Sequence, residues 1–440
     1  MRGGIDVTDT AGAPSGRNGG DVGLGPGVGA SAGGRGLARR RRRRWLRGVG
    51  LAVVVVVLAA GGAGWAVYAK LDGNITPDEE AAAELARYER ERPTSLVRGA
   101  QNILVIGSDS RSGDGNRRYG RDSGTERSDT TILLHLSAGR RSATAMSLPR
   151  DLMVDVPGCR RPDGSRTEPM FAMFNYAFQV GGSACTVRTV ERLTNIRVDH
   201  YVVVDFHGFK DMVDAVDGVE VCLAEPVHDK AAKLRLPAGR VTLDGEQALG
   251  YVRARKSLGN GSDTDRMDRQ QRFLGALVHK VRGNDVLLNP VRLYPVLDAA
   301  TSSLTTDPGL ASLRGLYELV RGVRDIPTER VQFLTVPRES YVYNSNRDQL
   351  VEPEAEKLFE RLRTDKPVVV TAVATRNSVT KSRNSAAGIE GDYSEYGTGA
   401  PDTVVYEAGK AAEKRSGEPA NDASPAPTFR GNTAAEDPCE

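Results

Sequence analysis

The chain has 440 residues, of which 39% are hydrophobic and 27% charged, and its formal net charge is +3. This length and composition are sufficient for one large buried core, so we expect a single large domain with tails. The basic charge is local, because residues 1–47 hold ten arginines against three aspartates. A basic region confined to one end of the chain argues against a nucleic-acid-binding domain, which carries its basic patch on a folded surface.

The N-terminal region predicts a membrane anchor. Residues 1–38 are rich in Gly and poor in apolar side chains, which is typical of disorder. Six arginines, Arg39 to Arg44, then precede Gly48–Ala69, a segment without any charged residue. A helix of this length crosses a hydrocarbon core of roughly 30 Å. The arginines predict a cytoplasmic N-terminus, with the rest of the chain outside the cytoplasm.

A cleaved signal peptide is the alternative, since Val67–Ala69 resembles a cleavage site. The apolar segment is longer than a usual signal-peptide core, which favours an uncleaved anchor. We therefore expect a cytoplasmic tail over 1–47, a single transmembrane helix over 48–69 and a helical stalk over 70–99.

The pattern beyond the stalk predicts an α/β domain over 100–368. The expected strands are Asn102–Gly107, Thr131–Leu136, Ala143–Leu148, His200–Phe206, Val219–Leu223 and Val331–Val336. Helical periodicity covers Phe171–Phe178, Thr186–Leu193 and Gly208–Val216, and most of the chain from Asp263 onward. Alternation of this kind is typical of a layered sheet with helices on its faces. Residues 369–440 show little periodicity, so we expect a disordered C-terminal tail.

Common hydrolase signatures are missing from this domain. There is no H-E-x-x-H and no G-x-x-x-x-G-K-[ST] sequence. A G-x-S-x-G match at Gly29–Gly33 and an S-x-x-K match at Ser378–Lys381 both lie in the predicted tails, without the strand and helix that such motifs need. The five histidines do not cluster along the sequence. These observations argue against serine-hydrolase and metallohydrolase chemistry.

Arginine and aspartate residues instead gather where predicted strands and helices begin or end. They are Asp109, Arg111, Arg127, Asp129, Arg150, Asp151, Arg253, Arg255, Asp263 and Arg266. Strand ends of an open α/β sheet are where ligands bind. Paired carboxylates suit Mg²⁺, and guanidinium groups form bidentate bonds to phosphate. Solvated surface salt bridges are the alternative for any single pair, so the residues alone indicate an anionic, phosphorylated ligand.

The last of these motifs predicts an anion-binding helix start. The spacing of Arg266, Arg269 and Gln270 places them on one helix face. Arg266 falls in the first turn, where free backbone N–H groups also favour anions.

The ordered motifs resemble the LytR-CpsA-Psr (LCP) family of cell-wall glycopolymer ligases. The similarity runs from about Asn102 to Leu277 and includes NILVIGSDSR, RSDTTILL, SLPRDLMVDVPG, DHYVVVDFHGF, LDGEQALGYVRAR and SDTDRMDRQQRFL. The resemblance implies a three-layer α-β-α sandwich with a mixed central sheet. It also implies a hydrophobic cavity for a polyprenyl chain, with the pyrophosphate of that lipid at its mouth.

Roles for individual residues follow from the resemblance. Asp109 and Asp129 match the carboxylates near a Mg²⁺ (or Mn²⁺) ion. The pyrophosphate cradle corresponds to Arg111, Arg127, Arg150, Arg253, Arg255, Arg266 and Gln270. Catalysis is expected to involve Arg150, Arg266 and two acids, Asp151 and Asp263, each of which is either a general base or an orienter of arginine. Two positions depart from the family pattern: Met173 stands where Lys is often found, and Asp265 where Gly is common.

The implied function is a phosphotransferase that attaches a teichoic-acid-like, capsular or other secondary wall polymer to peptidoglycan. Its expected partners are a polyprenyl-pyrophosphate-linked glycan donor, peptidoglycan as acceptor and membrane lipid, with no nucleic acid. A polyprenyl-pyrophosphate hydrolase is the first alternative, because the same cradle would serve with water as acceptor. A non-catalytic lipid-glycan-binding regulator is the second, and the presence of both Asp109 and Asp129 argues against it.

The four cysteines fit no metal or redox spacing. Cys159 follows Pro157-Gly158, and Cys185 follows a Gly-Gly pair after a predicted helix. We predict that these two form a disulfide in an oxidising compartment, rather than remaining free thiols. The chain-entropy model gives such a bridge roughly 3 kcal/mol. No pairing is predicted for Cys222 and Cys439.

Overall fold

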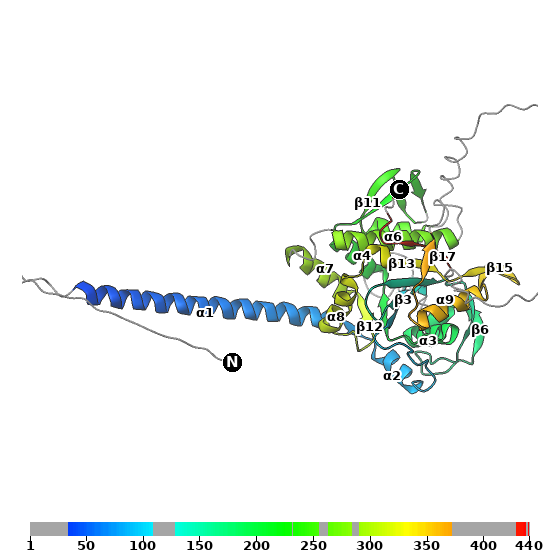
Figure 1. The fold of residues 1–440 in the computed structure, drawn as a ribbon, viewed down its shortest axis with the longest axis horizontal. Coiled ribbons are helices and arrows are strands. Elements are labelled where there is room, and N and C mark those ends of the chain that lie inside the picture. The colour runs from blue at the N-terminus through cyan, green and yellow to red at the C-terminus, as the bar shows by residue number, and fades with distance from the viewer. Residues whose placement is uncertain are drawn as a thin grey trace, which may run out of the picture. The chain divides into compact units, whose positions relative to one another are not determined.

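A computed structural model describes residues 34–108, 128–230, 232–254, 263–283, 290–371, 428–436 and 439. The chain divides into two compact units, Met1–Trp65 and Ala66–Glu440. Helix α1 runs from Gly34 to Asn74 (Figure 1). Within it, Trp45–Asn74 is long and apolar enough to cross a membrane, by length and composition. The helix extends beyond the predicted anchor at both ends, because the flanking Arg, Leu and Ala residues also favour helix.

The larger unit is organised around a mixed sheet. In the described residues this sheet has nine strands. In spatial order they are β1 (Thr76–Pro77), β12 (Leu304–Thr306), β7 (His200–Val204), β2 (Gln101–Ser108), β3 (Ser128–Leu136), β4 (Ala143–Leu148), β13 (Val331–Thr335), β17 (Thr428–Thr433) and β16 (Val369–Thr371). β2 is parallel to β7 and antiparallel to β3, and β4 is antiparallel to β3 and parallel to β13. The predicted mixed sheet is confirmed.

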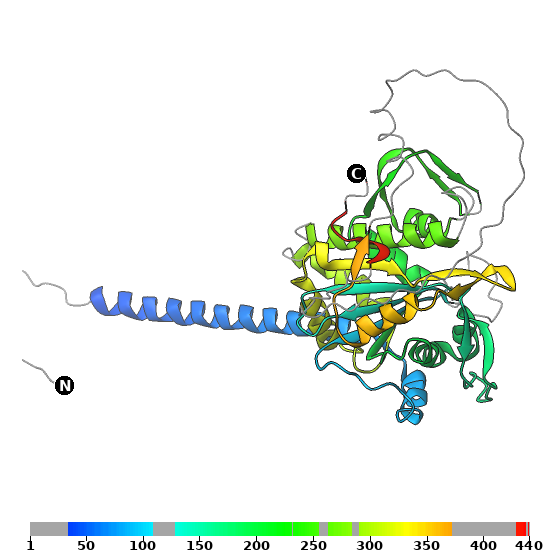
Figure 2. The ribbon, with the colours of Figure 1, turned by 45° about the vertical axis from the view of Figure 1, so that its right-hand side comes forward.

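Helices cover both faces of the sheet (Figure 2). Alternate side chains of β2 point to opposite faces of the sheet. On one face, Leu104 and Ile106 pack with α3 (Asn175–Thr194) and α9 (Glu354–Arg363). Ile103 packs on the opposite side, with α6 (Asp263–Gly283) and α8 (Leu313–Arg324). The period of two along a strand produces this separation. The three-layer α-β-α architecture is therefore as predicted.

A second group of elements packs beside α6. It comprises α4 (Phe206–Ala215), β8 (Val219–Leu223), β9 (Val227–Asp229), β10 (Leu234–Leu236), β11 (Gly239–Leu243) and α5 (Gly245–Arg253). Asp205 caps α4 by accepting a hydrogen bond of 2.8 Å from the Gly208 N–H, so β7 ends at Val204 rather than at the predicted Phe206. Asp244 and Gln247 form a capping box at the start of α5.

Two hairpins and one further helix add to the described fold. Two hairpins lie outside the main sheet: β5 (Met153–Val156) with β6 (Met170–Met173), and β14 (Arg338–Tyr341) with β15 (Asn344–Leu350). Helix α7 (Pro290–Ser302) contacts α4. The helix predicted over Phe171–Phe178 is wrong in its first residues, because Met170–Met173 pairs with β5 as a strand. Helix α3 instead starts at Asn175 and continues through a kink at Gly181–Gly182.

The predicted stalk over 70–99 is not a separate element. Leu71, Ile75, Ala81 and Leu85 are all buried, and α2 (Glu79–Arg87) packs against α3. Burial of these apolar side chains in the domain stabilises the segment more than exposure in a solvated stalk would.

The predicted C-terminal disorder is wrong for Thr428–Thr433. This segment forms β17, which pairs antiparallel with β13 and parallel with β16. Phe429 is buried, and Arg430 Nη2 lies 3.2 Å from Asp268 Oδ2 on α6. Main-chain pairing with a distant strand supplies the stabilisation that the local sequence does not indicate.

Candidate functional site

Several strand ends meet at one edge of the sheet. Ser108, the last residue of β2, pairs with Ser128, the first residue of β3. Thr131 pairs with Leu148, and Thr335 pairs with Ser147. The ends of β2, β4, β7 and β13 and the start of β3 therefore lie at the same edge. Of the polar residues expected to gather there, Arg150 and Asp151 directly follow β4, and Asp129 lies at the start of β3.

The register places one of the two predicted metal ligands, Asp129, next to the end of β2. Asp109 follows Ser108 directly and lies outside the described residues. The pairing shifts between Gly107 and Ser108, so Asp129 is an extra residue of β3 without a partner across the ladder. Such β-bulges are frequent beside active sites. Asp129 therefore lies in a bulge of β3, beside the residue that pairs with the last residue of β2.

Three other predicted residues, Arg111, Arg127 and Arg255, also lie outside the described residues, and Asp263 is known only as the first backbone position of α6. The described residues, which do not include Asp109, contain no group of three or more His, Cys, Asp or Glu side chains that could hold a metal ion. The cation site expected at Asp109 and Asp129 stays a prediction.

Arg150 and Asp151 follow β4 at this edge. Arg150 Nε lies 3.3 Å from Asp151 Oδ2. The Arg150 carbonyl accepts a hydrogen bond of 3.0 Å from the Asn175 N–H at the start of α3, and the Asp151 carbonyl accepts one of 3.1 Å from the Asp348 N–H. Both residues are thus held by main-chain contacts to separate elements, which fixes the position of their side chains.

Helix α6 contacts both the end of α5 and the ends of β4 and β13. Gln271 Nε2 lies 3.2 Å from Ser147 Oγ and 2.8 Å from Thr335 Oγ1. The neighbouring Gln270 donates to the Val252 carbonyl of α5 at 3.2 Å. Because one helix makes both sets of contacts, it connects predicted cradle residues on α5 and α6 with the edge where β4 ends.

The arginines of α5 and α6 differ in their surroundings. Arg266 is buried, with 6% of its surface exposed, whereas Arg253 is exposed and lies over the Phe206 ring, 4.4 Å from its centre. Arg269 is also buried and donates to the main-chain carbonyls of Tyr251, at 2.9 Å, and Ala254. Arg269 therefore stabilises the end of α5, a structural role.

The structure adds charged residues that the sequence analysis missed. Arg347 on β15 lies with Nη1 3.5 Å from Asp151 Oδ1. On the same hairpin, Arg338 forms an ion pair with Asp348. The segment is polar and lacks apolar alternation, so no local pattern marks it as a strand or connects it with Asp151.

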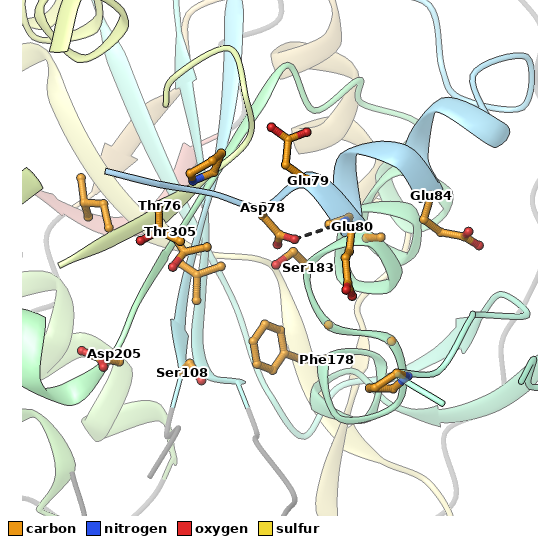
Figure 3. Close-up of a pocket in the computed structure, with 18 of the residues that line it drawn as sticks. Thr76, Asp78, Glu79, Glu80, Glu84, Ser108, Phe178, Ser183, Asp205 and Thr305 are labelled. Atoms are coloured by element: carbon orange, nitrogen blue, oxygen red, sulfur yellow. Dashed lines mark hydrogen bonds between the residues drawn. The ribbon is translucent and has the colours of Figure 1, made fainter. Parts of the chain in front are cut away.

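A cavity of about 1100 Å³ opens beside the same edge. Figure 3 shows Ser108 at the end of its strand, with Phe178 and Asp205 on either side. The opposite part of the lining carries the acidic side chains Asp78, Glu79, Glu80 and Glu84. This mixed lining differs from the hydrophobic cavity that the family resemblance implies.

Two disulfides lie in the larger unit. Cys159 and Cys185 are joined with an S–S distance of 1.98 Å and a Cα–Cα distance of 5.6 Å, in agreement with the pairing expected from the sequence. Cys222 of β8 is joined to Cys439, a pairing that the sequence analysis left open. The first bridge fastens the loop after β5 to α3, and the second fastens the C-terminal segment to β8.

Comparisons with known proteins agree with this architecture. The family model described as the LytR_cpsA_psr family matches residues 72–364. Over 236 residues the chain is 38% identical to the probable cell wall biosynthesis protein LcpB of Corynebacterium glutamicum, covering 52% of this chain and 54% of that protein. Over 313 residues it is 28% identical to the polyisoprenyl-teichoic acid–peptidoglycan teichoic acid transferase TagT of Bacillus subtilis, covering 68% of this chain and 89% of that one.

The coverage of relatives is uneven. The chain spans about half the length of LcpB and of the related LcpA, of which it covers 54% and 50%. A solved structure from Streptococcus agalactiae superposes with a TM-score of 0.51 at 21% identity, covering 62% of this chain and 92% of that one. This structural likeness supports the fold. Because the family model extends over most of the larger unit, the chain belongs to the LytR-CpsA-Psr family.

Proposed function

We propose that this protein is a membrane-anchored phosphotransferase that moves a glycopolymer from a polyprenyl-pyrophosphate carrier to peptidoglycan on the outer side of the membrane. The observation that carries the proposal is that Asp129, Arg150 and Asp151 lie beside paired strand ends at one edge of the sheet, with Asp109 following Ser108 in the sequence. Relatives with the same family domain bear names of teichoic acid transferases. The apolar helix Trp45–Asn74 suits a protein that acts on a lipid-linked donor.

The donor would be held by its charge. A pyrophosphate carries several negative oxygens, and guanidinium groups bind such oxygens with two parallel hydrogen bonds. Arg150 stands at the end of β4, and α6 brings Arg266 and Gln270 to the same region through the Gln271 contacts. Arg111, Arg127, Arg253 and Arg255 complete the proposed cradle.

The reaction needs little covalent participation by the protein. The acceptor hydroxyl of peptidoglycan attacks the phosphorus that bears the glycan, and the bond from this phosphorus to the bridging oxygen breaks. The glycan becomes linked through a phosphodiester, polyprenyl monophosphate leaves, and the hydroxyl proton passes to a carboxylate. Positioning and neutralisation of negative charge supply most of the rate acceleration in phosphoryl transfer.

A divalent cation fits this arrangement. Asp109 and Asp129 would hold Mg²⁺ (or Mn²⁺), since carboxylate oxygens are hard ligands that such ions prefer. When bound, the ion would neutralise part of the pyrophosphate charge.

The surroundings of Asp151 favour an orienting role over a general base. One of its oxygens faces Arg150 and the other faces Arg347, at 3.3 and 3.5 Å. A carboxylate engaged on both oxygens is suited to holding guanidinium groups in place. Asp263, the other acidic candidate, then remains for proton transfer.

The experiment combines the purified full chain in detergent with lipid-linked donor, Mg²⁺ and peptidoglycan, and follows the glycan. Glycan that sediments with peptidoglycan indicates transfer, whereas soluble phosphorylated glycan indicates hydrolysis. Asp109→Ala and Asp129→Ala should each abolish transfer with little change in melting temperature. Asp163→Ala, in an exposed loop, is the control and should keep full activity.

If these aspartates only form surface salt bridges, the melting temperature falls and activity per folded molecule is unchanged. Full transfer by both variants would rule out the proposed metal and pyrophosphate site.

A further inference from the structure

The hairpin of β14 and β15 is attached to the segment that carries Asp151. The Asp348 N–H donates to the Asp151 carbonyl at 3.1 Å, and Asp348 forms an isolated parallel bridge with Leu152. On the hairpin itself, Asp348 pairs with Ser340. Main-chain bonds therefore fix β15 alongside the end of β4, independently of any side-chain contact.

This attachment places two guanidinium groups on one carboxylate. Arg150 Nε lies 3.3 Å from Asp151 Oδ2, and Arg347 Nη1 lies 3.5 Å from Asp151 Oδ1. Arg338 and Asp348 form their own ion pair beside it. Three arginines and two aspartates therefore form one cluster of charged groups at the edge where the strands end.

Arg347 is the more accessible arginine of the hairpin. Its side chain is 31% exposed, against 13% for Arg338. Its contact with Asp151, at 3.5 Å, is at the long limit for a hydrogen bond. Charge-assisted bonds from guanidinium to phosphate are shorter and stronger. A phosphate oxygen could thus replace the carboxylate as the partner of Arg347 with little rearrangement.

We propose that Arg347 is part of the anion-binding site and binds a phosphate oxygen of the pyrophosphate donor, with Asp151 holding the guanidinium in position while the donor is absent. This residue lies outside the motifs that indicated the cradle, which end near Leu277. The proposal rests on the proposed function, because it assigns a further contact to the same substrate.

The test measures binding of inorganic pyrophosphate to the full chain in detergent by calorimetry. Arg347→Ala should weaken binding roughly 10- to 100-fold, since one charge-assisted hydrogen bond is lost. Arg347→Lys should restore part of the affinity, because an ammonium keeps the charge but cannot form the bidentate contact. Arg314→Ala is the matched control, since Arg314 is 82% exposed and pairs with Glu318 of its own helix. The Arg314→Ala variant should bind pyrophosphate as tightly as the wild type.

Kinetics and melting temperature separate binding from a purely structural role. The proposal predicts a raised KM for the lipid-linked donor with a smaller change in kcat. If Arg347 only supports Asp151, Arg347→Lys retains that ion pair and binds pyrophosphate as the wild type does, which would overturn the proposal. This comparison remains decisive if Arg347→Ala fails to fold.

The experiments distinguish failure of the proposed transferase function from failure of the proposed Arg347 contact. A wild-type protein that binds pyrophosphate through Arg347 but transfers no glycan would refute the transferase and support the binding role. Transfer by the wild type that is equalled by Arg347→Ala, with equal KM, would refute the binding role alone.

Discussion

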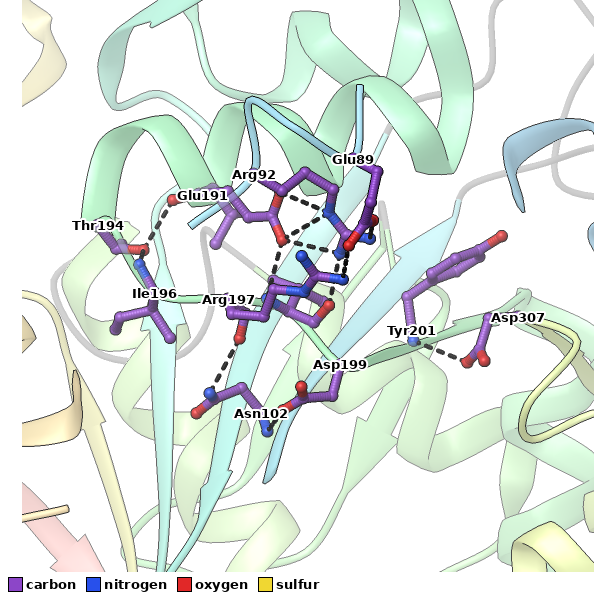
Figure 4. A network of polar contacts seen from close by, with 12 residues as sticks. Glu89, Arg92, Asn102, Glu191, Thr194, Ile196, Arg197, Asp199, Tyr201 and Asp307 are labelled. Atoms are coloured by element: carbon purple, nitrogen blue, oxygen red, sulfur yellow. Dashed lines mark hydrogen bonds and ion pairs between the residues drawn. The ribbon is translucent and has the colours of Figure 1, made fainter. Parts of the chain in front are cut away.

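Arg92 and Glu191, which are 99 residues apart in sequence, form a bidentate ion pair (Figure 4). Arg92 Nε lies 3.1 and 3.0 Å from the two carboxylate oxygens, and Nη2 lies 2.8 Å from Oε1. Only 11% and 3% of the two side chains are exposed. The same carboxylate accepts from the Val198 N–H at 3.0 Å. This pair anchors the segment after α2 to α3 and to the loop before β7.

Arg92→Ala should therefore destabilise the fold strongly. Removing one partner leaves the Glu191 charge buried and uncompensated, which costs about 3–5 kcal/mol. Arg197→Ala is the matched control, because Arg197 pairs with the half-exposed Glu89 at 2.8 Å, and such pairs contribute about 0–1 kcal/mol. Urea unfolding of both variants measures the difference. Equal losses of unfolding free energy in the two variants would contradict a strongly stabilising buried ion pair between Arg92 and Glu191.

The C-terminal strand makes a second prediction. A Cβ atom added at Gly431 of β17 would overlap the carbonyl oxygen of Phe333 on β13. Gly431→Ala should lower stability by about 1–3 kcal/mol, the usual cost of overpacking. At Gly275 on α6 the nearest atom would be 3.5 Å away, so Gly275→Ala is an ordinary helix substitution and should be neutral or stabilising. A Gly431→Ala variant that melts like the wild type would show that β17 does not pair with β13 in solution.

The parts of the fold that could be predicted are those with strong local patterns. β2 contains a continuous apolar run and every residue of β4 is buried, and the boundaries of both strands agree with the sequence analysis to within one residue. The position of Arg150 and Asp151 at one sheet edge followed from β4, because residues beside strand ends are placed by the strands themselves.

The parts that could not be predicted depend on distant partners. β17 is short and mixed in character, and its stabilisation comes from pairing with β13 and from the Cys222–Cys439 disulfide, whose cysteines are 217 residues apart. Arg347 lies 196 residues from Asp151 in sequence. No local pattern encodes either contact, so the sequence could not indicate that β15 contributes to the candidate site.

The proposed topology is tested by a reporter enzyme that is active only outside the cytoplasm, fused after Lys70. We expect activity, because the run Arg39–Arg44 favours retention of the N-terminus in the cytoplasm. Deleting the arginine run should reduce the fraction with this orientation. A reporter that is active only when fused at the N-terminus would place the domain in the cytoplasm and exclude transfer to peptidoglycan.

We expect the stability of the fold to depend on pH because of His200. Its Nδ1 lies 3.1 Å from Asp307 Oδ1, and this hydrogen bond raises the pKa of His200 above its ordinary value of 6.5. The folded protein therefore holds the proton more tightly than the unfolded chain. The resulting stability is fully present below pH 6.5 and is lost as the pH rises through the raised pKa.

Replacing the His200 imidazole should remove this pH dependence of stability. The stability difference between wild type and His200→Gln should be largest near about pH 5.5 and should shrink toward about pH 9. His207→Gln is the control, since His207 is 54% exposed and lies 3.4 Å from Asp211 on the surface. A difference that grows with rising pH would contradict the assigned ion pair.

The role of Asp151 gives the last prediction. Both of its oxygens face guanidinium groups, so we expect Asp151→Asn to disturb the placement of Arg150 and Arg347 and to leave proton transfer intact. Loss of a general base typically costs 10²–10⁴ in rate. We therefore expect kcat to fall by less than roughly 100-fold, with the rise of kcat with pH retained. Asp155→Asn, at an exposed position of β5, should behave as the wild type. Asp263→Asn should cause the larger loss and flatten the pH profile, because Asp263 is the remaining acidic candidate. The reverse ranking, with a flat profile for Asp151→Asn, would identify Asp151 as the base.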